Sequence, residues 1–441
     1  MDILTRLHNL PAGRFHYRLL LLVGIGWLFD AMDTGMVSFV LPVLTKQWQL
    51  TPAQSAWIVG IAFAGMALGA VAGGRAADRF GRRNVFAASM MVYGAATGLC
   101  ALAPDVDSLL VWRFAAGIGL GAQLPVAVSL VSEYAPPQLR GRFIVLLESF
   151  WGLGWLAAAL ASYFLIPRYG WASAFALGAL PLPYALWVRT RLPESVPYLL
   201  GRGRVQEAHE IVCRMEAAAG RQPENRALAA VPPAAKPPRF AELWRPPFAR
   251  RTLMLWPVWF GIVFSYYGIF TWLPKLLVGQ GHTVVQTFEY MLVLITAQLP
   301  GYFAAAVLVE KIGRKATLAL FLAACSLCAW RFGGAQSADA VLAWGAAMSF
   351  FNLGAWGVLY TYTPELYPVR FRAAGSGWAA AAGRLGGIAA PSAVALLLQR
   401  QSGFDAIFAM FAGVMAAVVV LILVLGEETR GRTLEDISRQ L

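Results

Sequence analysis

The stretch Asp78-Arg79-Phe80-Gly81-Arg82-Arg83 returns 232 positions later as Glu310-Lys311-Ile312-Gly313-Arg314-Lys315. The same offset relates four further pairs of residues: Pro42 and Pro274, Glu133 and Glu365, Pro136 and Pro368, and Arg140 and Arg372. A register that holds over this distance without a gap indicates two homologous halves. In a membrane, two such halves with a site between them are a common basis of alternating access, so the repeat predicts a transporter.

The composition excludes a soluble domain. The chain is 59% hydrophobic and 13% charged, and its mean hydropathy is +0.59. About twelve apolar stretches come near the roughly 20 residues that a membrane-spanning helix needs. They lie at 19–44, 56–77, 84–104, 107–131, 143–166, 171–190, 253–279, 286–309, 315–333, 339–363, 373–398 and 404–426. We therefore expect an all-α membrane protein with twelve transmembrane helices in two pseudo-symmetric six-helix bundles.

The long polar stretch between the halves sets the expected domains. They are an N-terminal six-helix bundle, a cytoplasmic linker with short helices, a C-terminal six-helix bundle and a cytoplasmic tail, at 1–190, 191–252, 253–426 and 427–441. The linker holds an amphipathic segment at 204–219 and a Pro/Ala-rich connector at 231–238. Arginine and lysine gather before the first span, after the last, and in every second loop. This bias predicts that both termini are cytoplasmic. The net charge of +13 then reflects topology and contact with the lipid bilayer, and no nucleic acid partner is expected.

No pattern in the sequence indicates catalysis. All four histidines lie outside the apolar stretches, and Cys325 and Cys328 stand inside one without a second pair of ligands. A Gly-x-x-x-x-Gly-Lys-Ser/Thr phosphate loop, a metal-ligand cluster and a nucleophile–base pair are all missing. We therefore expect neither an enzyme nor a bound metal or cofactor.

Three segments carry a family resemblance. Gly74-x-x-x-Asp78-Arg79-x-Gly81-Arg82-Arg83 is similar to the loop signature of the major facilitator superfamily. Arg113-Phe-Ala-Ala-Gly117-Ile-Gly119-Leu-Gly121 and Pro193-Glu194-Ser195 resemble patterns of its sugar-porter-like members. The resemblance implies two six-helix bundles that rock about a midplane site. It also implies that charged residues at the cytoplasmic helix ends form a gate between the bundles: Asp78, Arg82, Glu133, Arg140, Glu310, Arg314, Glu365 and Arg372.

Charged residues inside the expected spans are candidates for proton coupling. Each costs at least about 2.5 kcal/mol at the bilayer centre unless it is solvated or paired. Asp30 and Asp33 lie three residues apart and so share one face of a helix. Asp33 opposite Arg113 suits a carboxylate that gains and loses a proton, and Glu148 is a weaker candidate. Asp33-Thr-Gly resembles the coupling segment of sugar-porter-like proton symporters. Asp30-Ala-Met-Asp33 resembles a pattern of aromatic acid:proton symporters.

The expected substrate follows from Arg384, which lies deep in an apolar stretch without an acidic neighbour. Its guanidinium matches a carboxylate through two hydrogen bonds, although it could instead reach a neighbouring helix. Aromatic residues are abundant in the spans, whereas amides are scarce, which favours a flat aromatic acid over a polyol. The residues expected to bind substrate are Arg384, Trp151, Tyr266, Tyr267, Asn352, Trp356, Tyr360 and Gln298.

The combination of Phe29-Asp-Ala-Met-Asp33, Pro193-Glu194-Ser195 and the glycine-rich segment around Arg384 is similar to bacterial niacin permeases. These belong to the branch of the superfamily that includes synaptic-vesicle glycoproteins. The resemblance implies proton-coupled uptake of a nicotinate-like anion by a monomer in a bacterial inner membrane. An organic cation or drug efflux carrier and a hydroxybenzoate or sugar symporter remain alternatives. In an efflux carrier the aspartates would bind the cargo and Arg384 would be structural.

Overall fold

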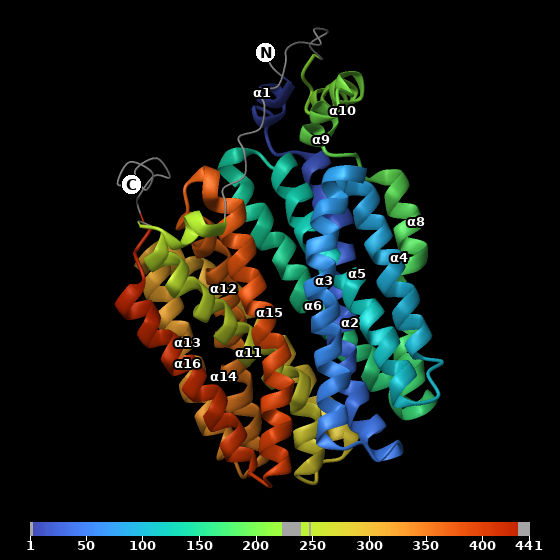
Figure 1. Cartoon of the computed structure of the whole chain (residues 1–441), viewed down its shortest axis with the longest axis vertical. Helices are drawn as coiled ribbons and strands as arrows, with labels where there is room; N and C mark the ends of the chain where they lie inside the picture. Colours follow the sequence, from blue (N-terminus) through green and yellow to red (C-terminus); the bar gives the residue numbers. More distant parts are fainter. Residues whose placement is uncertain (1–2, 223–239, 247, 431–441) are drawn as a thin grey trace. The chain divides into compact units, whose positions relative to one another are not determined.

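The computed structural model describes residues 3–222, 240–246 and 248–430, and within these ranges the regular structure is entirely helical. This confirms the all-α prediction (Figure 1). The short helices are α1 (Ile3–His8), α7 (Trp171–Leu177), α8 (Pro181–Arg191), α9 (Val196–Gly201) and α10 (Val205–Ala218). The long helices are α2 (Arg14–Gln47), α3 (Pro52–Phe80), α4 (Arg82–Cys100), α5 (Val106–Tyr134), α6 (Arg140–Tyr169), α11 (Ala249–Gly279), α12 (Val284–Ile312), α13 (Arg314–Gly333), α14 (Ala338–Glu365), α15 (Val369–Gln399) and α16 (Phe404–Leu425). The predicted connector at 231–238 and most of the predicted tail lie outside the described residues.

Each of the twelve apolar stretches coincides with helix. Within the described residues, eleven stretches are long and apolar enough to cross a membrane, and α4, with 19 residues, supplies the twelfth. The sixth stretch is divided into α7 and α8. Pro181 opens α8 and has no N–H to continue the hydrogen-bond ladder. A side chain at Gly178 would overlap Thr97 of α4, so the break lies where the chain packs closely.

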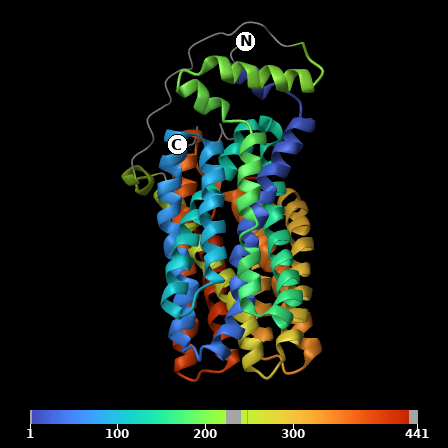
Figure 2. The same cartoon turned by 90° about the vertical axis from the view of Figure 1, so that its right-hand side faces the viewer.

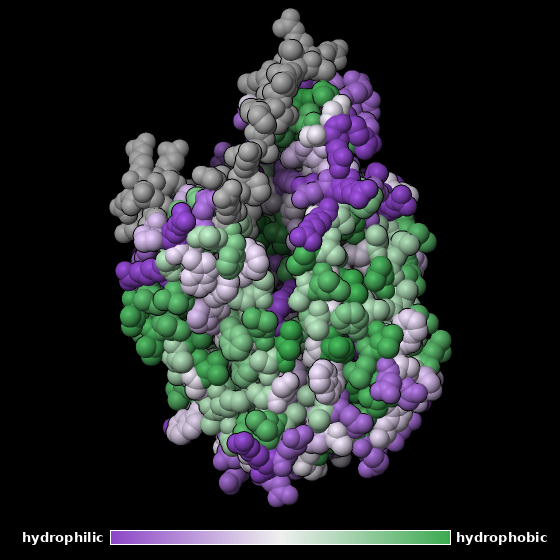
Figure 3. All heavy atoms as spheres, in the orientation of Figure 1, coloured by the Kyte–Doolittle hydropathy of each residue, from purple (hydrophilic) through white to green (hydrophobic). Residues whose placement is uncertain are grey.

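The surface of the long helices suits a lipid environment. Figure 3 shows hydrophobic residues along the helix sides and hydrophilic residues gathered at the helix ends. Large apolar side chains are strongly exposed there, for example Phe303 of α12 at 68%, Val424 of α16 at 63% and Val111 of α5 at 62%. Water would oppose such exposure, whereas lipid tails accept it. The chain is therefore a multi-pass membrane protein.

Helix ends outside the spans are capped by side chains. Asp105 accepts the backbone N–H of Ser108 at 2.8 Å, and Thr283 caps α12 in the same way through Gln286. The hydrogen bonds from the Ser108 backbone and side chain lower the pKa of Asp105. These capping boxes fix where α5 and α12 begin.

Residues that lie close together in space group the chain into two compact units. Unit 1 comprises Met1–Thr34, Ala64–Trp155 and Ala172–Ala234. Its helices α3 and α5 meet through glycines, because a Cβ at Gly65 would overlap Phe114 and one at Gly69 would overlap Ile118. Figure 2 shows α10 lying across the ends of the long helices of this unit. There α1 packs against α10.

Unit 2 comprises Gly35–Phe63, Leu156–Trp171 and Ala235–Leu441. Within it, α11 packs against α15 and α16, α12 against α14, and α13 against α14 and α16. The helices α2, α3 and α6 each contribute residues to both units, so the units do not follow chain order. The predicted division into an N-terminal and a C-terminal bundle stays a prediction.

Candidate functional site

A buried ion pair lies in the middle of unit 1. The Nη1 atom of Arg113 in α5 lies 2.9 Å from the Oδ1 atom of Asp33 in α2, and each side chain is 2% exposed. Thr97 of α4 donates its hydroxyl to the other carboxylate oxygen of Asp33. The structure therefore brings Asp33 and Arg113 together as the sequence suggested, while Thr97 was not foreseen. A threonine in an apolar helix gives no signal of such a contact.

Further polar groups are buried near this pair. Asp30 and Glu148 are each 3% exposed. The Oε1 atom of Glu148 has no hydrogen-bond partner, and neither has the Nε2 or the Oε1 atom of Gln123. A Cβ at Gly154, in the helix of Glu148, would overlap the backbone of α2, so α6 lies directly against α2. Unit 1 thus holds three buried carboxylates and one buried guanidinium inside its spans.

The aromatic residues expected to bind substrate are divided between the units. Trp151 lies in unit 1, where its ring centroid is 5.3 Å from that of Trp27. The others lie on α11 and α14 in unit 2, where Tyr266 and Trp356 are 5.7 Å apart and Trp356 and Tyr360 also 5.7 Å. We call Trp259, Tyr266, Tyr267, Trp356 and Tyr360 the aromatic cluster of unit 2.

Buried polar atoms accompany the aromatic cluster. The amide of Gln298 in α12 is fully buried, and neither its nitrogen nor its oxygen has a hydrogen-bond partner. The Nε1 atom of Trp356 is buried without a partner as well. Asn352 is 2% exposed on α14. Native proteins rarely leave buried polar atoms unpaired, so Gln298 and Trp356 are candidates to bind a ligand.

Arg384 is half-buried in α15. The preceding residue, Gly383, lies against Trp259, because a Cβ there would come within 3.3 Å of the indole. α15 therefore runs directly beside the aromatic cluster of unit 2 at this level.

The charged residues expected to form a gate are paired within each repeat. In the first repeat, Arg82 lies 3.2 Å from Asp78 and 3.5 Å from Glu133. In the second, Arg314 lies 3.0 Å from Glu365, and Glu310 is exposed.

Of the two arginines expected to complete the gate, only Arg140 has a described side chain, and it forms no ion pair with another described residue. The Nε atom of Arg140 is buried without a partner, and the side chain of Arg372 lies outside the described part of the chain. The role of these residues as a gate stays a prediction.

Two glutamates organise these ends. Glu194 belongs to the Pro193-Glu194-Ser195 pattern that the sequence analysis singled out, but the contacts of neither glutamate were predicted. Glu194 accepts the backbone N–H of Arg83 at 3.1 Å, and Glu428 accepts the backbone N–H of Arg314 at 2.9 Å. The carboxylate of Glu194 lies against Gly81, whose φ is 94°, and that of Glu428 lies against Gly313, whose φ is 95°. Glycine adopts such positive φ values readily. The repeated glycine is the signal that could have found them. Glu194 and Glu428 are 234 positions apart (428 − 194), two more than the offset of 232 that relates the other repeated residues.

The contacts of Lys275 were not predicted from the sequence either. Its Nζ atom donates to Ser55 at 2.6 Å and lies 5.1 Å from the centroid of the Trp272 ring. All three residues belong to unit 2. Lys275 is a half-buried side chain of α11.

Comparison with known proteins gives a consistent result. A model of the family described as sugar (and other) transporter matches residues 29–441. A niacin transporter, NiaP, of Acinetobacter baylyi is 58% identical over 99% of this chain and 100% of its own length. A Bacillus subtilis protein with the provisional name niacin/nicotinamide transporter NiaP is 44% identical over 95% of this chain and 98% of its own. The inward-open structure of the xylose transporter XylE from E. coli matches with a TM-score of 0.74 over 96% of this chain and 99% of that one. Its identity is 17%, which supports the fold alone.

Proposed function

This chain belongs to the sugar (and other) transporter family, and on that premise we propose that it takes up nicotinate together with a proton. The observation that carries the proposal is the 58% identity, over nearly the full length of both chains, with a protein named as a niacin transporter. The chain is a transporter and not an enzyme. What the proposal adds is the substrate, the coupled ion and the residues that act on each.

The groups in unit 2 suit nicotinate, which is a flat pyridine ring with one carboxylate. Arg384 would bind the carboxylate through its guanidinium fork. The aromatic cluster offers ring faces and edges for the pyridine, and aromatic pairs favour such offset or edge contacts. Gln298 would donate to the ring nitrogen, which supplies a partner for an amide that has none among the described residues, and Asn352 would be a second polar group for the ligand.

The groups in unit 1 suit proton coupling. Asp33 forms an ion pair with Arg113, and separation of the pair during transport would free the carboxylate to act in proton coupling. Asp30 and Glu148, which are also buried in unit 1, would serve as further proton acceptors. Trp151 would contribute an aromatic surface from the same unit. The charged residues at the helix ends would close one state of the transporter by pairing and open the other by separating.

The proposal includes topology and assembly. The bias of arginine and lysine toward alternate loops supports cytoplasmic termini in a bacterial inner membrane. We expect a monomer. One proton carried with one monoanion moves no net charge. A membrane potential of 100 mV acts with about 2.3 kcal/mol on each elementary charge that crosses, so it would hardly affect this transport.

Uptake by the purified protein in liposomes tests substrate and coupling. We expect a pH gradient, acidic outside, to accelerate uptake of labelled nicotinate several-fold, and a potassium-diffusion potential alone to have little effect. Excess unlabelled nicotinate should compete, and nicotinamide, which lacks the carboxylate, should not. Strong drive by the potential would refute the one-proton stoichiometry.

Binding measurements on variants test the carboxylate site. Arg384→Gln should weaken nicotinate binding at least tenfold, because a hydrogen bond to a charged group contributes about 1.5–3 kcal/mol. Arg400→Gln is the matched control, since Arg400 is exposed at the end of the same helix. Equal affinity of both variants, or stabilisation by organic cations and not by nicotinate, would contradict the proposal. The second result would favour the aspartates of unit 1 as cargo ligands.

A further inference from the structure

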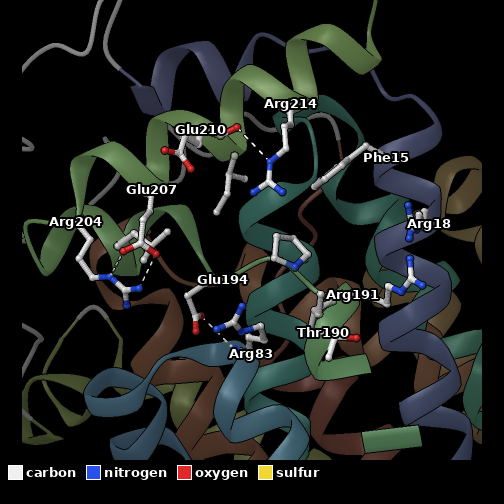
Figure 4. Close-up of a pocket in the computed structure, with 14 residues that line it drawn as sticks. Phe15, Arg18, Arg83, Thr190, Arg191, Glu194, Arg204, Glu207, Glu210 and Arg214 are labelled. Atoms are coloured by element: carbon white, nitrogen blue, oxygen red, sulfur yellow. Dashed lines mark hydrogen bonds and ion pairs between the residues drawn. The ribbon is translucent and has the colours of Figure 1, made fainter. Parts of the chain in front are cut away.

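A basic pocket lies in unit 1, at the ends of the long helices and beneath α10 (Figure 4). Its volume is about 480 Å³. Arginines from five places in the sequence line it: Arg18 of α2, Arg83 of α4, Arg191 of α8, Arg204 before α10 and Arg214 of α10. The proposed transport cycle uses none of these residues. By the charge bias of the loops, this end of unit 1 is the one expected to face the cytoplasm.

Acidic residues of the pocket offset part of this charge. Three glutamates line it beside the five arginines, so two positive charges remain in excess. Arg204 and Glu207 pair with each other at 2.5 Å, so that arginine is satisfied. The Glu194 carboxylate is occupied by backbone N–H groups of Arg83 and Ser195, at 3.1 and 2.9 Å. Of the acidic lining residues, only Glu210 remains, and Arg214 donates to its backbone carbonyl at 3.4 Å.

Four guanidinium groups therefore face the pocket without a carboxylate partner in the described part of the chain. They belong to Arg18, Arg83, Arg191 and Arg214. Figure 4 shows Arg214 extending from α10 toward the side of the pocket where Arg83 and Arg191 lie. The Nε atom of Arg83 is also buried and has no hydrogen-bond partner. A buried donor left without a partner is costly, and an anion in the pocket would remove that cost.

We propose that this pocket binds a phosphate group. Several guanidinium groups that converge from different helices suit a phosphate, whose oxygens accept charge-assisted hydrogen bonds in pairs. The volume leaves room for a group attached to the phosphate. The same chemistry occurs in the headgroup of an anionic lipid of the inner leaflet and in a soluble phosphate ester. Basic pockets at the cytoplasmic ends of spans are suited to anionic headgroups.

A bound phosphate would have a structural consequence within unit 1. It would connect Arg214 of α10 with Arg18, Arg83 and Arg191 at the ends of α2, α4 and α8. In the structure, α10 packs against α9 and α1. The ligand would therefore fix α10 on the helix ends, so its binding is expected to protect α10 from hydrogen exchange. This proposal does not depend on the identity of the transported substrate.

Binding of a soluble phosphate is tested by calorimetry on the full chain. The ligands are inorganic pyrophosphate and inorganic phosphate, at low ionic strength. The test variant is Arg191→Gln/Arg214→Gln, whose two arginines are exposed and so can be replaced without loss of the fold. The control is Arg189→Gln, two residues from Arg191, whose side chain bonds Asn84 at 3.4 Å and does not line the pocket. We expect the double variant to bind at least tenfold more weakly and the control to bind within twofold of the unchanged protein. Binding should weaken with added salt.

The lipid source is tested in nanodiscs of phosphatidylcholine with and without phosphatidylglycerol, by native mass spectrometry after release. Retained phosphatidylglycerol that disappears in the double variant and persists in the control would establish a headgroup site. Pyrophosphate binding with the same pattern would establish a soluble ligand, and either result supports the proposal. Loss to the same extent in Arg189→Gln, or no phosphate binding from either source, would overturn it. Arg18→Gln serves as an independent single variant and is expected to weaken binding several-fold.

Discussion

Arg113 holds Asp33 in an ion pair of 2.9 Å inside unit 1, and both side chains are 2% exposed. Thr97 donates to the second carboxylate oxygen, so both oxygens of Asp33 are engaged. A buried pair of this kind adds little to stability compared with apolar residues of the same size, because both charges lose their hydration. Its presence in a span is therefore better explained by transport than by folding.

A double-mutant cycle tests how strongly the pair is coupled. Asp33→Asn leaves the Arg113 guanidinium buried without its counter-ion, and we expect a loss of about 3–5 kcal/mol in the free energy of unfolding. Arg113→Gln should cost a similar amount. The double variant Asp33→Asn/Arg113→Gln should be more stable than the sum of the two losses predicts, because no buried charge remains. Thermal unfolding in detergent measures all four proteins, and simple additivity would show that the two residues are not coupled.

Gln298 allows stability and ligand binding to be separated. Its amide is buried without a partner, so Gln298→Met, which keeps the length of the side chain, removes an unsatisfied group. We expect the ligand-free protein to become more stable, by about 1–3 kcal/mol at most, and nicotinate to bind more weakly. Calorimetric affinity and unfolding temperature report the two effects. A variant that is less stable and binds normally would show that Gln298 has a structural role only.

The sequence predicted the helices well and the contacts poorly. Apolar length alone located all twelve spans, because a helix across a bilayer must satisfy every backbone group within itself. The break between α7 and α8 was missed, because it depends on how closely Gly178 meets Thr97. Asp33 and Arg113 were matched because charges in a span need partners. The partners Thr97 and Ser55 escaped notice, because a hydroxyl in an apolar helix is common and gains meaning only from its neighbour in space.

The N-terminal helix α1 is fixed to α10 by a buried ion pair. Arg6 donates to Glu216 at 2.6 and 2.9 Å, and the side chains are 2% and 8% exposed. Glu216 raises the pKa of Arg6, so the arginine keeps its charge at every accessible pH. We expect Glu216→Gln to release α1, seen as at least tenfold faster hydrogen exchange at 3–8 with no change in the long helices. The exposed pair of Arg204 and Glu207 provides the comparison, because Glu207→Gln should leave exchange at α1 unchanged. Unaltered exchange in Glu216→Gln would show that apolar contacts alone hold α1.

The contact between α3 and α5 depends on glycine at particular positions. A Cβ at Gly69 would overlap the carbonyl oxygen of Ile118, and backbone cannot move aside as a flexible side chain can. Gly69→Ala should therefore force the two helices apart and lower the free energy of unfolding by about 1–3 kcal/mol. Gly74→Ala is the matched control on the same helix, since nothing lies within 4 Å of its Cβ position. At that site alanine should be neutral or slightly stabilising, because it favours helix over glycine by up to about 1 kcal/mol. The change in unfolding temperature should therefore have opposite signs in the two variants. Equal destabilisation would show that the loss of any glycine in α3 lowers stability, whether or not α5 lies close to it.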